Sequence, residues 1–323
     1  MSRSQRIAVV AVGGNSLIVS KDKTSLSDQF RAASTTVKHL TAMIESGWKV
    51  VITHGSGPQV GFILRRSEIA LGEVPPVPMD YAGADTQGGV GWMFQRALHN
   101  ELQRRGFDVR VIALVTKVLV DRNDPAFRDP TKPIGTLMDE ATAKRLAEQN
   151  GWTVKADSAH GWRRVVPSPQ PQAIVELETI RLLLEARHVV IACGGGGIPV
   201  FEDEAGNYQG IEAVVDKDLT SSLLAQNLRA DLFLVSTGVE RVALEFNTPR
   251  QRWVDRMTLA EVRVAIAQGQ FDKGSMGPKI QAILAYLENG GTQALITDPA
   301  HIEQALAGLA GTSFVPEWES PRA

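Results

Sequence analysis

The sequence contains a single cysteine, Cys193, among 323 residues, so no disulfide can form within the chain. Such scarcity is typical of proteins from a reducing compartment, and we expect this protein in the cytoplasm. Zinc sites built from cysteine pairs are excluded for the same reason. The six histidines show no spacing typical of metal ligands, so we predict no metal held by protein side chains.

Long apolar runs and runs of one charge sign are also missing. No stretch approaches the roughly 18–20 apolar residues of a membrane span, and the amino terminus lacks the pattern of a signal peptide. The formal net charge is −2, which argues against nucleic acid or a membrane surface as a partner. Neither G-x-x-x-x-G-K-[ST] nor G-x-S-x-G occurs, which argues against a P-loop and against a hydrolase nucleophile elbow.

What the sequence does contain is a regular alternation of strand-like and helix-like segments. Short apolar runs at 7–12, 49–53, 109–116 and 188–192 resemble buried parallel strands. Between them, apolar residues recur at helical spacing over 30–44 and 86–105. This order predicts an α/β fold, a three-layer αβα sandwich around a mainly parallel central sheet.

The composition changes twice along the chain. Prolines and tryptophans accumulate over about 121–171, where we predict a protruding, hairpin-rich subdomain with one helix at 139–149. We place a boundary near residue 200, which gives a first lobe at 1–200 and a second at 201–323. In the second lobe we predict a hairpin over 199–215, strands at 232–236 and 294–296, and helices at 219–228, 259–267 and 279–287.

Three strand-like runs end in glycine. They are followed by Gly13-Gly14, by Gly55-Ser56-Gly57 and by four glycines from Gly194. The carboxyl ends of parallel strands share one edge of a sheet, where ligands bind and exposed amides suit phosphate. One such junction is often an ordinary turn, but three together predict a phosphate site. The Gly55 loop also comes near a dinucleotide fingerprint, although its glycine spacing is one residue too long, so an NAD-dependent enzyme is an alternative.

Lysines stand close to these loops. Lys217 and Lys279 lie at predicted helix starts and Lys132 lies in a proline-rich loop. A cation at a helix amino terminus opposes the macrodipole and calls for an anion nearby. Singly, each lysine is more typical of a solvated surface, but together they suit a phosphoryl group in transfer. We interpret Cys193 as a buried thiol and His54 as a loop-shaping residue, not as a nucleophile and a base.

Together these motifs resemble those of the carbamate kinases, within the amino acid kinase family, over almost the whole chain. The motifs are Ala11-Val-Gly-Gly-Asn15, His54-Gly-Ser-Gly-Pro-Gln-Val-Gly61, Asp85-Thr-Gln-Gly88, Asp124-Pro-Ala-Phe127, Pro130-Thr-Lys-Pro-Ile-Gly135, Gly161-Trp-Arg-Arg-Val-Val-Pro-Ser-Pro169, Cys193-Gly-Gly-Gly-Gly-Ile-Pro199, Val215-Asp-Lys-Asp-Leu219 and Gly274-Ser-Met-Gly-Pro-Lys279. Acetylglutamate kinase-like members of the family carry a lysine at the position of Ala11, whereas carbamate kinases use the lysine that matches Lys132.

The resemblance implies reversible phosphoryl transfer between carbamoyl phosphate and ADP, giving ATP and carbamate. It implies that the first lobe holds carbamate or carbamoyl phosphate, that the second holds the nucleotide, and that Mg2+ accompanies ADP or ATP. A homodimer and a place in arginine or purine catabolism are implied as well. The implied catalytic residues are Lys132, Lys217, Lys279 and Asp218. The implied phosphate and substrate site comprises Gly13, Gly14, Asn15, Gly55, Ser56, Gly57, Gly195 and Gly196. The implied nucleotide site comprises Lys217, Thr237, Gly238, Val239, Met276, Gly277 and Lys279.

Three positions depart from the family pattern. Ser56 replaces an asparagine, and Ala243 and Glu245 replace a tyrosine and an asparagine in the segment that borders the nucleotide base. Two alternatives therefore stay open beside the leading hypothesis. One is a non-catalytic sensor of nucleotide or carbamoyl phosphate on the same fold. The other is a kinase for another small carbamoyl-like or carboxylate acceptor.

Overall fold

A large central sheet organises the molecule. The computed structural model describes residues 6–14, 17–18, 20, 22–157, 161–272 and 274–317. Within these residues eight strands form one sheet in the order β15-β17-β16-β12-β1-β2-β9-β3. They are β1 (Ile7–Val12), β2 (Lys49–His54), β3 (Val111–Ala113), β9 (Val189–Ile191), β12 (Leu232–Ser236), β15 (Arg256–Thr258), β16 (Ala294–Thr297) and β17 (Thr312–Val315). All neighbours are parallel except β16 and β17, which confirms the predicted mainly parallel sheet.

The centre of the sheet shows why the apolar runs form strands. β1 lies between β2 and β12, and five of its six residues are fully buried. Alternate side chains of a strand point to opposite faces. Accordingly, Ala8 and Val10 pack in one hydrophobic cluster and Val9 and Ala11 in another. A strand buried on both faces needs a continuous apolar sequence, and β1 has one.

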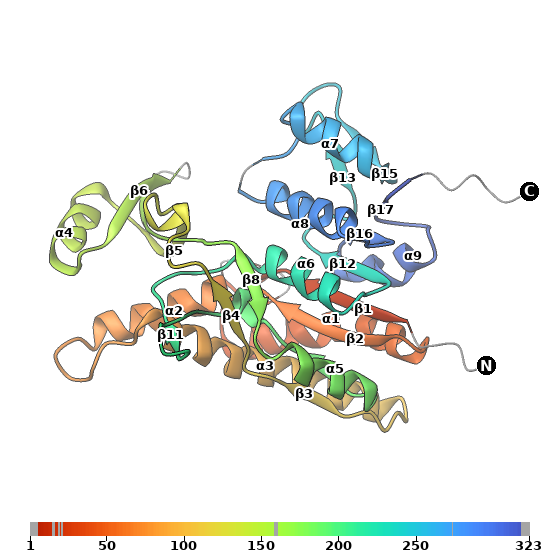
Figure 1. Ribbon diagram of the computed structural model, residues 1–323, viewed down its shortest axis with the longest axis horizontal. Helices are drawn as coiled ribbons and strands as arrows, with labels where there is room; N and C mark the ends of the chain where they lie inside the picture. Colours follow the sequence, from red (N-terminus) through yellow and green to blue (C-terminus); the bar gives the residue numbers. More distant parts are fainter. Residues whose placement is uncertain are drawn as a thin grey trace, which may run out of the picture.

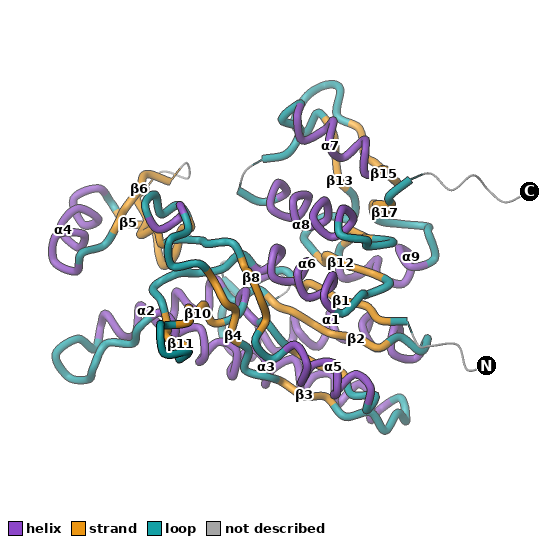
Figure 2. Tube along the Cα trace, in the orientation of Figure 1, coloured by secondary structure: helices purple, strands orange, loops and turns teal. Residues whose placement is uncertain are grey.

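Helices cover both faces of this sheet (Figures 1 and 2). One face carries α1 (Leu26–Glu45), α3 (Met79–Arg104) and α9 (Ile302–Leu306), whose buried side chains share the cluster of Ala8 and Val10. The other carries α5 (Leu177–Glu185), α6 (Lys217–Asn227), α7 (Leu259–Ala267) and α8 (Met276–Glu288), whose side chains share the cluster of Val9 and Ala11. The predicted three-layer αβα sandwich is therefore confirmed.

Some predicted element boundaries were wrong. Helix α3 begins at Met79, seven residues before the predicted start at 86, and its N-cap position is Pro78. The strand predicted over 109–116 is only Val111–Ala113, and at Thr116 the backbone amide already bonds to the side chain of Gln87 instead of to the sheet. Helix α8 begins three residues before the predicted 279, so Lys279 lies inside its first turn.

Beside the central sheet, the described residues form three smaller sheets, of which β13-β14 is a two-stranded antiparallel pair. In the described residues, β11-β10-β4-β8 form a four-stranded sheet and β5-β7-β6 a three-stranded one. Their strands are β4 (Lys117–Val120), β5 (Lys132–Met138), β6 (Thr153–Asp157), β7 (Gly161–Val166), β8 (Pro171–Ile174), β10 (Ile198–Glu202) and β11 (Tyr208–Gly210). The remaining elements are α2 (Gly57–Ile69), η2 (Pro125–Phe127), α4 (Glu140–Asn150), η3 (Gly194–Gly196), β13 (Val242–Leu244), β14 (Arg252–Val254) and η4 (Pro299–His301).

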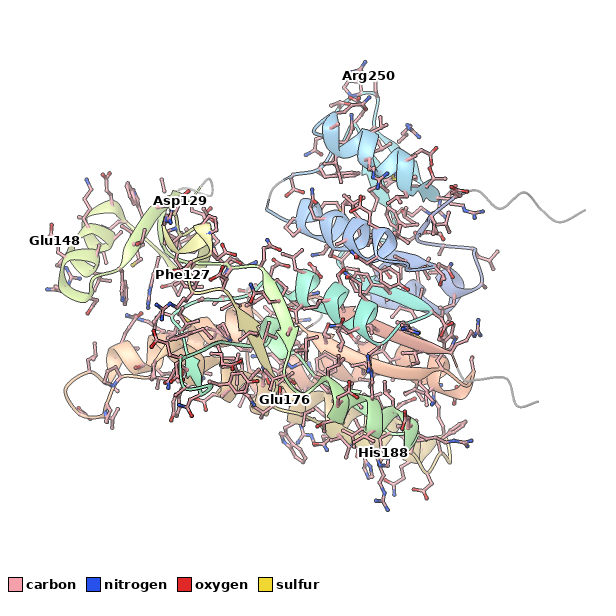
Figure 3. The ribbon with its side chains drawn as sticks, viewed as in Figure 1. Phe127, Asp129, Glu148, Glu176, His188 and Arg250 are labelled. Atoms are coloured by element: carbon pink, nitrogen blue, oxygen red, sulfur yellow. The ribbon has the colours of Figure 1, made fainter. Side chains whose placement is uncertain are left out.

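The β5-β7-β6 sheet and α4 stand apart from the central sheet in Figure 1. Figure 3 marks this region with Asp129 and Glu148, whereas Arg250 lies in the loop region near α7 on the opposite side of the molecule. β1 of the predicted first lobe pairs with β12 of the predicted second lobe, so one sheet runs through both lobes. The boundary near residue 200 therefore stays a prediction. Across the described residues, the structure contains no helix long and apolar enough to cross a membrane.

Candidate active site

Three glycine turns meet at the carboxyl ends of β1, β2 and β9. A Cβ atom on Gly55 would lie 2.8 Å from the backbone nitrogen of Gly14, so only glycine allows the first two turns to approach this closely. A Cβ atom on Gly195 would lie 2.4 Å from Ser56 Oγ, which places the third turn against the second. The structure therefore brings the predicted phosphate-binding glycines together, including Gly13, Gly57 and Gly196 from the same turns.

The amino terminus of helix α6 lies at this edge of the sheet. Asp216 is its N-cap and accepts a hydrogen bond from the backbone nitrogen of Asp218 at 2.9 Å. The other carboxylate oxygen of Asp216 accepts from Lys132 Nζ at 2.6 Å. Lys132 is the first residue of β5, 84 residues earlier in the chain. The protruding sheet therefore places the ammonium group of Lys132 at the start of α6.

The other two predicted lysines converge on one carboxylate. Lys217 Nζ donates to Asp218 Oδ1 at 2.6 Å, and Lys279 Nζ donates to Asp218 Oδ2 at 3.0 Å. All three side chains are largely buried, with exposed fractions of 12%, 13% and 5% for Lys217, Lys279 and Asp218. Burial by itself would raise the pKa of the Asp218 carboxyl, but the two ammonium groups outweigh burial and hold that pKa well below its usual value.

The cluster carries a positive excess near the glycine turns. Three lysines face two carboxylates, Asp216 and Asp218. A cavity of about 80 Å3 lies between the turns and the protruding sheet, and Ser56, Gly57, Gly195 and Lys132 line it. Backbone amides and a lysine at a small cavity, with two further lysines nearby, can bind an anion and stabilise charge that moves between oxygens.

The residues predicted to bind nucleotide lie along the same edge of the sheet. Thr237 follows β12, donates its backbone N–H to the Thr297 carbonyl at 2.9 Å, and lies next to Gly13. The loop continues through Gly238 and Val239. Met276 and Gly277 begin α8 and bond through their backbone nitrogens to Asp272, and Lys279 of the same first turn reaches Asp218. The predicted contribution of Asn15 concerns a residue outside those that the structure describes.

Two titratable groups border the site without reaching it. The His54 ring is buried and stacks on Phe94, with 5.9 Å between ring centroids. Burial, with a smaller contribution from Lys217, lowers the pKa of His54 to about 4, although its hydrogen bond to Gly55 acts in the opposite direction. Burial raises the pKa of the Cys193 thiol. Both groups are therefore neutral near pH 7, which suits the structural roles that the sequence predicted for them.

Sequence reasoning missed several polar side chains that hold these loops. Thr220 Oγ1 donates to the Gly196 carbonyl at 2.9 Å, and Ser221 Oγ lies 2.6 Å from Thr53 Oγ1. Gln87 bonds to Thr116 and to Gly194. Gln87 belongs to the motif at 85–88, whereas nothing in the local sequence marks the hydroxyl contacts. In the part of the chain that the structure describes, no group of three or more His, Cys, Asp or Glu residues could hold a metal ion.

The fold and this edge define a phosphoryl-transfer class of protein, and comparison with known proteins supplies the family. The model of the amino acid kinase family matches residues 6–298. The chain therefore belongs to the amino acid kinase family, and it is a kinase.

Within this family, the chain is similar over nearly its full length to proteins named carbamate kinase or carbamate kinase-like. The chain is 45% identical over 313 residues to the carbamate kinase of Pyrococcus horikoshii, covering 95% of this chain and 98% of that protein. It is 43% identical to the carbamate kinase-like protein YahI of Escherichia coli, covering 96% and 99%. The structure of carbamate kinase from Giardia lamblia bound to AMP-PNP superposes with a TM-score of 0.91 at 35% identity, covering 98% and 99%.

Proposed function

We propose that this protein is a carbamate kinase, which transfers a phosphoryl group between carbamoyl phosphate and ADP. The observation that carries the proposal is the convergence of Lys217 and Lys279 on Asp218, beside Lys132 and the glycine turns. These side chains come from the protruding sheet and from the two helices α6 and α8. Relatives at 42–45% identity that are named carbamate kinase support the same reaction.

The proposed reaction needs positioned charge more than proton transfer. An oxygen of the ADP β-phosphate forms a bond to the phosphorus of carbamoyl phosphate while the bond between phosphorus and the carbamoyl oxygen breaks. Carbamate leaves as an oxyanion and later yields ammonia and CO2, so no proton has to move in the transfer step. Lys132, Lys217 and Lys279 would neutralise the phosphoryl oxygens, and the amides of the glycine turns would bind them.

Asp218 would act as the organiser of the two lysines. Its oxygens already accept from Lys217 and Lys279, so it is poorly placed to act as a base. Its depressed pKa keeps it ionised at every pH at which the enzyme is expected to work. The carboxylate therefore fixes where the two ammonium groups lie before substrate arrives, which is the preorganisation that electrostatic catalysis requires.

Magnesium would come with the nucleotide. Both oxygens of Asp216 and both of Asp218 already accept hydrogen bonds, so these side chains suit lysine binding better than direct coordination of a metal. Mg2+ usually keeps several waters and binds substrate phosphates, and its contribution would be to neutralise charge between the nucleotide phosphates. We propose that nucleotide phosphates and water, not Asp216 or Asp218, hold it.

The test is ATP formation from carbamoyl phosphate and ADP by the purified protein, followed with luciferase. We expect activity in the natural protein and a loss of about 100-fold to 1,000-fold in kcat for Lys279→Met, as for removal of one transition-state donor. Lys144→Met is the matched control, because Lys144 forms an exposed ion pair with Glu140 on α4, away from the site.

The proposal fails if the natural protein forms no ATP, or if Lys279→Met and Lys144→Met have the same activity. Binding of ADP without any turnover would favour the sensor alternative. Acetyl phosphate and other small acyl phosphates, used as phosphoryl donors in the same assay, decide which small acid accepts the phosphoryl group in the reverse reaction. This panel matters because Ser56 lines the small cavity and because two relatives at 42–43% identity are named only carbamate kinase-like.

We also propose that the protein works in the cytoplasm as a homodimer. The lone cysteine supports the compartment. A groove of about 860 Å3 between α1, α2 and α3 supports the dimer, because its lining is mainly apolar and includes Phe30, Phe62 and Trp92. Trp92 is 57% exposed, and Arg96 stacks between Phe30 and Trp92. Tryptophan and arginine are enriched in protein interfaces, so a second copy of this chain is the expected occupant.

A further inference from the structure

Gln87 connects α3 to the turn that carries Gly195 and Gly196. Its side chain is 5% exposed and lies on the sheet side of the helix. The amide nitrogen Nε2 donates to the carbonyl of Thr116 at 3.0 Å and to the carbonyl of Gly194 at 3.2 Å. Its Oε1 accepts from the backbone nitrogen of Thr116 at 2.7 Å. One buried side chain therefore bonds to both backbone groups of Thr116, which lies between β3 and β4, and to the carbonyl of Gly194, the first residue of η3.

Thr116 in turn holds both ends of the glycine turn. Its Oγ1 accepts from the backbone nitrogen of Cys193 at 3.1 Å, and its carbonyl accepts from the backbone nitrogen of Ile198 at 2.9 Å. Thr116 thus bonds to both ends of the turn between these two residues, and Gln87 bonds to the backbone of Thr116. Because Thr116 is fully buried, water cannot replace either partner without a change in packing.

The far side of this turn faces Ser56 and the segment that leads into α6. Gly195 lies against Ser56, and a Cβ atom on Gly196 would lie 2.2 Å from the Val215 carbonyl, two residues before Lys217. Thr220 of α6 also donates to the Gly196 carbonyl. The turn therefore separates the Gly55 loop from the start of α6, and its position sets the distance between Ser56 and Lys217.

We propose that Gln87 and Thr116 are positioning residues for phosphoryl transfer, which act by fixing the 193–198 turn between the Gly55 loop and α6. The inference rests on the proposed function of the site and adds two residues that touch neither substrate. Small displacements of positioned groups can lower a rate strongly, about 100-fold for 1 Å. Loss of either side chain should therefore lower kcat more than it changes the KM for ADP.

Gln87→Met is the first test, because methionine has a similar volume and makes none of the three hydrogen bonds. Gln95→Met is its matched control. Gln95 lies on the same helix and donates Nε2 to the Val111 carbonyl at 2.7 Å, so it also links α3 to the next strand, but at β3. We expect Gln87→Met to lower kcat by about 10-fold to 100-fold and Gln95→Met to keep the natural rate.

A second pair of variants separates positioning from folding. Thr116→Ser keeps the hydroxyl that accepts from Cys193, whereas Thr116→Val has the same shape without it. We expect Thr116→Val to lower kcat and Thr116→Ser to retain it. The double variant of Gln87→Met and Thr116→Val should be no slower than the slower single variant, because both act on one turn.

Amide hydrogen exchange tests the inference without any turnover. The peptide spanning 189–199 should exchange faster in Gln87→Met and in Thr116→Val than in Gln95→Met and Thr116→Ser. The inference is overturned if exchange in this peptide is the same in all four variants, or if Gln87→Met and Gln95→Met share one kcat. An inactive natural protein would contradict the proposed function, and the exchange experiment would still decide the role of Gln87.

Discussion

At the scale of single residues, Asp218 decides whether the site can hold its positive charge. The carboxylate attracts both ammonium groups and so offsets their mutual repulsion, which lets Lys217 and Lys279 stay close together and largely buried. Lys217 and Lys279 are far apart in the sequence, and their hydrogen bonds to this one carboxylate hold them together in the site. An asparagine at 218 would keep the shape and leave the two charges unpaired.

The buried imidazole of His54 gives a prediction about pH. Its pKa is lowered from 6.5 to about 4 in the folded protein, mainly by burial. The unfolded chain therefore binds a proton at His54 between these two values while the folded protein does not. Stability from this residue is fully present above about pH 6.5 and is lost as the pH falls toward about 4, with a slope of up to about 1.4 kcal/mol per pH unit.

His54→Gln removes this titration and should flatten the pH dependence over that interval. The measurement is the free energy of unfolding in urea at several pH values between about 4 and 7. A natural protein whose stability falls no more steeply than that of His54→Gln on acidification would contradict the assignment of His54 as a buried neutral ring.

At the scale of elements, the 193–198 turn depends on glycine at a defined place. Gly196 has a φ of +97°, and a Cβ atom there would lie 2.2 Å from the Val215 carbonyl. Alanine at 196 must therefore adopt a disfavoured backbone conformation and also displace the segment before α6. The first effect alone costs about 1–3 kcal/mol, and the second should lower activity as well.

Gly269→Ala is the control for Gly196→Ala. Gly269 has a φ of +68°, and a Cβ atom there would meet nothing within 4 Å. Unfolding in urea and ATP formation should show a modest loss of stability with full activity for Gly269→Ala. For Gly196→Ala they should show a larger loss of stability and reduced activity. Equal effects of the two variants would show that contact with Val215 is unimportant.

Sequence patterns predicted those elements whose signals are local. The strand at 232–236 and the helix at 259–267 have the predicted bounds, because an apolar run and a capping box at Thr258 mark them. Helix α3 runs without a break from Met79 and was predicted too short, because its first turns contain Gly83, a residue of low helix propensity. Predicting its true start would have required the packing of Met79 and Ala82 against α2 and the protruding sheet.

The candidate site was predictable as a set of residues but not as a geometry. Glycine junctions and lysines at helix starts are visible in the sequence, because each has a local physical cause. The pairing of Lys132 with Asp216 is not, since it depends on how the protruding sheet folds back. The contacts of Gln87 were equally hidden, although the residue belongs to the motif at 85–88, because only the folded chain brings its backbone partners on Thr116 and Gly194 together.

At the scale of the whole molecule, the exposed face of α3 should decide the oligomeric state. Trp92→Glu places a charge in the apolar groove and should shift the protein from dimer to monomer in light scattering at low micromolar concentration. Trp253→Glu is the control, since Trp253 is 54% exposed on β14 and lies outside the groove. A dimer that survives Trp92→Glu, or a natural protein that is monomeric, would contradict the proposed interface.

The position of β1 at the middle of the sheet has a consequence for synthesis on the ribosome. One neighbour, β2, follows within the first 54 residues, but the other, β12, is complete only at residue 236. The nascent amino-terminal half therefore carries an unpaired strand edge while some 180 further residues are translated. Exposed edges of this kind favour aggregation, so newly made chains should depend on chaperones until β12 emerges.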